Sequence, residues 1–108
     1  MERAGRLYLA GSITHDPSFR ERFSYWKQVF SDEGWQVVSP AEITQAIDPD
    51  GWERADAMRV DIPLLMTCSA IFMIETWERS RAARCEWSIA EALEMVILYS
   101  NTDWEDCA

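Results

Sequence analysis

The stretch Ala70-Ile71-Phe72-Met73-Ile74, with the helical pattern from Ser80 to Met95 that follows Glu75 to Arg79, decides the fold of this chain. The apolar run predicts a buried strand, and the segment after it predicts a loop leading into a helix. At about 100° per residue, Glu86 lies in the middle of the helix's small, apolar face, among Ala82, Ala83, Ile89, Ala90 and Leu93. Because an unpaired buried carboxylate is costly, Glu86 needs a partner, a polar cleft or a function.

Two interpretations of Glu86 are open at this point. It is either a functional carboxylate or a structural one that benefits from the positive end of the helix dipole. In the structural case it could also reach Arg81 or Arg84 at the surface. Perturbed carboxylates mark functional sites only statistically, so the pattern does not separate the two.

Size and charge restrict the class of protein. The 108 residues predict one domain, residues 1–108, with a single core. No apolar run approaches the roughly 20 residues that span a bilayer, and the first five residues lack the apolar part of a signal peptide. We therefore expect a cytoplasmic protein with no membrane partner. The net charge of −9 opposes binding of long nucleic acid but permits one phosphate held by backbone N–H groups at a helix start.

The cysteines and the histidine give no metal-binding pattern. Cys68, Cys85 and Cys107 form no C-x-x-C pair, so we interpret them as free thiols. The single histidine, His15, is either a lone catalytic imidazole or a solvated loop residue. We expect neither a metal nor another cofactor.

Strand-like and helical segments alternate along the chain. Strands are predicted at 7–10, 35–38, 70–74 and 96–99, helices at 17–34, 52–67 and 80–95, and a short helical turn at 41–46. Pro63 predicts either a kink or a new helix capped by Asp61. The alternation predicts an α/β fold, a compact Rossmann-like or flavodoxin-like three-layer sandwich, with a parallel sheet of four or five strands ordered about 2-1-3-4. Ligands bind such sheets beyond the carboxyl ends of strands 1 and 3, which places 11–16 and 75–86 around one cleft.

Several motifs, taken in their order, resemble a known superfamily. They are Tyr8-Leu9-Ala10-Gly11-Ser12-Ile13, Asp61 before an amphipathic helix end, and Ser80 six residues before Glu86. Together they resemble the nucleoside 2-deoxyribosyltransferase superfamily, which includes the deoxynucleoside 5′-monophosphate N-glycosidases. Ser39-Pro40-Ala41-Glu42 and Trp77-Glu78-Arg79-Ser80 look like a small branch found in bacteria and phages. The resemblance covers nearly the whole chain and implies cleavage or transfer at the bond between a nucleobase and C1′ of the sugar.

The resemblance also implies roles for individual residues. Glu86 matches the nucleophile that attacks C1′, and Asp61 matches the acid that handles the proton of the departing base. Ser80 matches a serine that contacts the 5′-phosphate, and the substrate-lining positions are matched by Tyr8, Gly11, Ser12, Ile13 and Ala82. Trp77 is either a roof over the base or a packing residue of a lid, and Asp61 is either catalytic or an N-cap.

The resemblance further implies a homodimer or higher homo-oligomer. Relatives often complete the site with the C-terminal segment of a neighbouring subunit, which corresponds here to Asn101. The chain also departs from the superfamily, because Arg81-Ala82-Ala83-Arg84-Cys85 replaces a segment that commonly holds glycine. At the positions of the arginine and glycines of the phosphate-specific enzymes, this chain has Thr14, His15 and Asp16. Arg79 or Arg81 could compensate for the lost phosphate contacts, unless each forms an ion pair with Glu75 or Glu78.

Two other functions are compatible with the sequence. The first is a binding module that retains the pocket without catalysis and sequesters a nucleotide-like ligand. The second is an interaction protein whose acidic surface mimics nucleic acid to occupy a basic partner.

Overall fold

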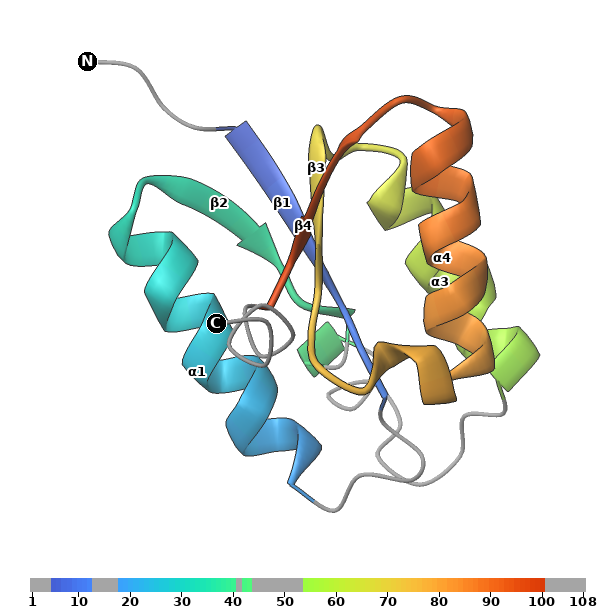
Figure 1. Ribbon diagram of the computed structural model, residues 1–108, viewed down its shortest axis with the longest axis horizontal. Coiled ribbons are helices and arrows are strands. Elements are labelled where there is room, and N and C mark those ends of the chain that lie inside the picture. Colours follow the sequence, from blue (N-terminus) through green and yellow to red (C-terminus); the bar gives the residue numbers. More distant parts are fainter. Residues whose placement is uncertain (1–4, 13–17, 41, 44–53, 101–108) are drawn as a thin grey trace, which may run out of the picture.

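The computed structural model describes residues 5–12, 18–40, 42–43 and 54–100 (Figure 1). Its strands are β1 (Gly5–Ala10), β2 (Trp35–Val38), β3 (Ala70–Met73) and β4 (Val96–Tyr99). Its helices are α1 (Phe19–Asp32), α3 (Arg54–Leu65), α4 (Arg81–Ala92) and the short 3₁₀ turn η1 (Trp77–Arg79). The strands form one parallel sheet in the order β2-β1-β3-β4. The predicted α/β class, parallel sheet and strand order are therefore confirmed.

Strand β1 lies inside the sheet and pairs with a strand on each side. Its Leu7 is opposite Val37 of β2 and opposite Ala70 of β3. On the far side of β3, Met73 is opposite Tyr99 of β4. The carboxyl ends of β1 and β3 thus lie next to each other, at the position where ligands bind such sheets.

Alternate residues of the strands serve two different cores. Leu7 and Leu9 of β1 pack on the side of α1, whereas Tyr8 and Ala10 pack on the side of α3 and α4. Figure 1 shows the same division, with α1 alone on one face of the sheet and α3 and α4 together on the other. The result is the predicted sandwich of three layers.

The aromatic stripe of α1 forms most of the core on its face of the sheet. Phe23 and Phe30 are buried, and the ring centroids of Trp26 and Phe30 lie 4.6 and 4.8 Å from that of Phe72 in β3. The helix ends before Gly34, which has a φ of +99°. Since this left-handed conformation favours glycine, the predicted helix end is explained by local backbone geometry.

Helix α3 differs from the prediction because it runs through Pro63 without a break. Asp61 therefore lies inside the helix, and the interpretation of Asp61 as the N-cap of a new helix is wrong. Proline removes one backbone N–H from the helical hydrogen bonds. These bonds resume beyond Pro63, where the Met66 N–H donates to the Ile62 carbonyl oxygen at 3.0 Å.

Helix α4 is shorter than predicted. It ends at Ala92, and Glu94 adopts a φ of +59° as the chain turns towards β4. Leu93 is consequently 50% exposed, so its predicted place on the buried face is wrong. The predicted turn at 41–46 is only partly described, and Glu42 and Ile43 are helical there. In the described part of the chain, no helix combines the length and apolar character needed to cross a membrane.

Candidate active site

The glutamate singled out from the sequence lies on the inner face of α4. Ser80 caps this helix, with its Oγ accepting a hydrogen bond of 3.1 Å from the Ala83 backbone N–H. Glu86 follows in the second turn and is only 5% exposed, with Ala83 and Ala90 buried one turn before and after it. Small side chains at these positions let the helix approach the sheet closely. Burial also shows that Glu86 does not reach the surface to pair with Arg81 or Arg84.

The partner of Glu86 is Tyr8 of β1. The fully buried Tyr8 hydroxyl donates a hydrogen bond of 2.7 Å to Glu86 Oε2. The sequence placed Tyr8 among the substrate-lining residues and did not predict this bond, although strand alternation puts residue 8 on the face that α4 covers.

A second carboxyl group comes from α3. Asp61 is 8% exposed, and its buried Oδ1 has no hydrogen-bond partner in the described residues. Its charge raises the pKa of both Glu86 and Tyr8, so it lies within electrostatic reach of them. Three elements far apart in sequence, β1, α3 and α4, thus bring Tyr8, Asp61 and Glu86 together. We call these three residues the acidic cluster.

Burial changes the protonation of the acidic cluster. It raises the pKa of Glu86 from 4.5 to about 8, with the charge of Asp61 raising it further and the Tyr8 hydrogen bond lowering it. Burial likewise raises the pKa of Asp61 to about 6. The pKa of Tyr8 is raised well above its usual value, chiefly by burial, so its hydroxyl stays protonated as a donor. Interacting carboxyl groups titrate as a pair, and this pair holds about one proton near neutral pH.

The first-loop residues are only partly described. Ser12, two residues after the end of β1, is buried. A Cβ on Gly11 would lie 3.0 Å from Ile74 Cβ and 3.4 Å from the Phe23 ring, so Gly11 allows close packing against the protein itself on the α1 side. Outside the described residues lie Ile13, Thr14, His15, Asp16 and Asn101.

Trp77 belongs to an aromatic group that includes two residues the sequence did not single out. Its ring centroid lies 6.1 Å from that of Trp87 at an angle of 19°, and 6.3 Å from that of Tyr99. The Trp87 indole N–H donates a bond of 2.8 Å to the Tyr99 hydroxyl. Trp77 of η1 thus packs against α4 and β4. Ser80 and Ala82 are half-buried at the neighbouring start of α4.

A small hollow lies where β3 and β4 end. Its volume is about 20 Å³, and it is lined by Met73, Glu75, Thr76, Trp77, Glu78, Tyr99 and Ser100. Thr76 has a φ of +71°, which is rare for a β-branched residue and is found disproportionately at functional sites. Glu75 Oε2 lies 3.2 Å from Arg22 Nη1 of α1. The ion pair of Glu75 is thus made with α1, and not with Arg79 or Arg81.

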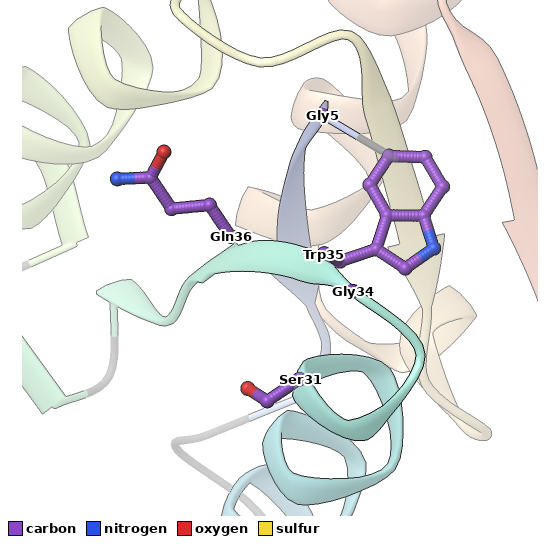
Figure 2. A pocket seen from close by; sticks show the side chains of 5 residues that line it. All are labelled: Gly5, Ser31, Gly34, Trp35 and Gln36. Carbon is purple, nitrogen blue, oxygen red and sulfur yellow. The ribbon is translucent and has the colours of Figure 1, made fainter. Parts of the chain in front are cut away.

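A larger hollow, of about 550 Å³, occupies the opposite end of the sheet (Figure 2). It lies at the amino ends of β1 and β2 and is lined by Gly5, Ser31, Gly34, Trp35 and Gln36. These five residues carry no ionisable side chain, in contrast to the acidic cluster. In the described residues, no three or more histidine, cysteine, aspartate or glutamate side chains are grouped to hold a metal ion. Cys68 and Cys85 are free thiols.

Fold and geometry together define a Rossmann-like α/β domain with a buried acidic cluster on the face of the sheet that α3 and α4 cover. More specifically, the chain belongs to the family described as "Domain of unknown function (DUF4406)", whose sequence model matches residues 5–99. A comparison with curated proteins gives no match.

Proposed function

We propose that this protein cleaves, or transfers the sugar across, the N-glycosidic bond of a (deoxy)nucleoside or nucleoside 5′-monophosphate, with Glu86 as the nucleophile. The observation that carries the proposal is the buried Glu86 carboxyl, bonded at 2.7 Å to Tyr8 and accompanied by the second buried carboxyl of Asp61. Two carboxyl groups that share about one proton provide a nucleophile and an acid within one buried cluster.

The reaction has two steps in which these groups exchange a proton. When substrate binds, the proton that Glu86 holds in the empty site passes to Asp61. Glu86 then attacks C1′ as a carboxylate while the bond from C1′ to the base nitrogen breaks, and Asp61 gives the proton to that nitrogen. Water or a second base then attacks C1′ and passes a proton to Asp61, which releases Glu86 from the ester. Tyr8 holds Oε2 throughout, so that Oε1 is free to form the ester.

Groups at the start of α4 suit the other end of the substrate. The Ser80 hydroxyl accepts the bond from Ala83 but can still donate its own hydrogen. A helix start attracts anions, and the exposed side chains of Arg79 and Arg81 flank it. A 5′-hydroxyl or 5′-phosphate would bind here, with Ser12 and Gly11 towards the sugar and Trp77 above the base.

The test is release of free base from a panel of deoxynucleosides, ribonucleosides and their 5′-monophosphates, followed by chromatography. We expect Glu86→Ala and Glu86→Gln to lower turnover at least about 10³-fold, because both remove the nucleophile. Glu91→Gln, an exposed change on the same helix, is the matched control and should leave turnover unchanged. Undiminished activity in both Glu86 variants would refute its role as nucleophile.

A binding module without turnover is the second candidate. The supporting observation is that burial raises the pKa of Glu86 to about 8, so this carboxyl is mostly protonated at neutral pH when the site is empty. A ligand would then raise the melting temperature and be recovered unchanged. Detection of free base would eliminate this candidate.

We also propose a cytoplasmic homo-oligomer, on the grounds of the superfamily resemblance. Sedimentation at high protein concentration tests the assembly, and a monomer at all concentrations would contradict it. The acidic surface considered from the sequence is described only in part, through the exposed Glu91 and Glu94.

A further inference from the structure

We infer that the hollow at the carboxyl ends of β3 and β4 selects substrates whose base carries an exocyclic amino group rather than a keto oxygen. This inference rests on the function proposed above and concerns which base is accepted. It starts from the side chain of Glu75, whose two carboxylate oxygens have different surroundings.

One oxygen of Glu75 is paired and the other is not. Oε2 lies 3.2 Å from Arg22 Nη1, which fixes the side chain against α1. Oε1 is buried and has no hydrogen-bond partner in the part of the chain that the structure describes. A buried acceptor without a donor is unfavourable, and in native structures such an atom is usually satisfied by water or a ligand. Glu75 is one of the residues that line the hollow, and we therefore place the donor for Oε1 there.

The size and chemistry of the hollow indicate which donor fits. A volume of about 20 Å³ holds one water-sized group, such as an amino nitrogen, but not a ring. An ionised carboxylate only accepts hydrogen bonds. An amino group therefore binds Glu75, whereas a keto oxygen at the same position brings lone pairs against negative charge.

The surroundings of the hollow suit the ring that carries this group. Trp77 and Tyr99 line it with aromatic side chains, against which a flat base can pack. The turn η1, which contains Trp77, leads directly into the helix that carries Glu86. In addition, the Ile74 amide donates a bond of 2.8 Å to the Ala10 carbonyl, tying the end of β3 to the end of β1.

Matched substrate pairs test the inference on the unaltered protein. Deoxycytidine is compared with deoxyuridine and deoxyadenosine with deoxyinosine, each with and without a 5′-phosphate. We expect kcat/KM at least about tenfold higher for the amino member of each pair, because a site built around a hydrogen bond discriminates against the analogue that lacks the donor. Equal values within the pairs would overturn the inference and leave the proposed function intact.

Two variants assign the preference to the carboxylate. Glu75→Gln presents both a donor and an acceptor, so the preference for amino bases should disappear. Arg22→Gln breaks the same ion pair but keeps the carboxylate, so the preference should persist. Loss of the preference in Arg22→Gln alone would overturn the assignment to Glu75.

Failure of the proposed function can be recognised separately. If no compound releases base, calorimetry with free cytosine and free uracil measures the same discrimination without chemistry. Tighter binding of cytosine would support the inference, and equal or absent binding of both would overturn it.

Discussion

The two faces of the sheet are built from the same strands but bury different chemistry. Towards α1, the buried side chains are aliphatic or aromatic: Leu7, Leu9, Phe23, Phe30, Ala70, Phe72 and Ile74. Towards α3 and α4, the apolar core includes small alanines and surrounds Tyr8, Asp61 and Glu86. Because burial of charge is unfavourable, the buried carboxyl groups on the second face lower the stability of the fold. The apolar packing on the first face offsets that loss. The comparison predicts that substitutions on the α1 face change stability and those in the acidic cluster change activity.

The largest effect on stability is expected from Phe72 on the α1 face. Phe72→Ala removes a side chain that is 3% exposed and packs against Trp26 and Phe30, so it should lower the free energy of unfolding by about 3–5 kcal/mol. Urea denaturation measures the change. Turnover per folded molecule should stay within about threefold of the parent, and a loss comparable to that of Glu86→Ala would contradict the division between the faces.

Glu86→Gln should have a smaller effect on stability, and one that depends on pH. Folding raises the pKa of Glu86 from 4.5 to about 8, so between these values the folded state binds more protons than the unfolded state. The free energy of unfolding therefore falls as pH rises from about 4.5 to 8, and the full penalty is present above that window. Urea denaturation at pH 5, 7 and 9 should show a shallower decline for Glu86→Gln, which becomes more stable than the parent at pH 9.

The matched control for this pH dependence is Glu91→Gln. It makes the same substitution at an exposed position of α4 and should leave the slope of stability against pH unchanged. An equal slope in the parent and Glu86→Gln would mean that burial does not raise the pKa of Glu86 in the folded state.

Tyr8→Phe should give the smallest change, a shift in pH dependence. The hydroxyl lowers the pKa of Glu86, so its loss should raise that pKa further and move the rising limb of the rate–pH profile to higher pH. Turnover at pH 7 should fall about tenfold and recover in part at pH 9. An unshifted profile would show that the 2.7 Å bond does not set the ionisation of Glu86.

Local pattern predicted much of the fold. Strands β2 and β4 begin and end at the predicted residues, because short apolar runs form them and Gly34 and Ser39 bound β2. Parallel order followed from alternation of strands and helices. The inward orientation of Glu86 followed from helical periodicity, because α4 has a polar and an apolar face.

What the sequence did not reveal depends on packing between distant segments. The bond from Tyr8 to Glu86 joins residues 78 positions apart, and no local pattern encodes it. Pro63 suggested a helix boundary near Asp61, but tertiary packing keeps α3 continuous and buries that carboxyl. The ion pair between Arg22 and Glu75 crosses from α1 to the end of β3 and has the same non-local origin.

The long separation between Tyr8 and Glu86 has a consequence for synthesis of the chain. During translation β1 leaves the ribosome early, but the carboxylate that its tyrosine must meet emerges 78 residues later. Contacts this distant in sequence close late in folding, because loop-closure entropy must be offset first. The acidic cluster therefore forms only after α4 has packed on the sheet, and a nascent chain that ends before α4 lacks Glu86.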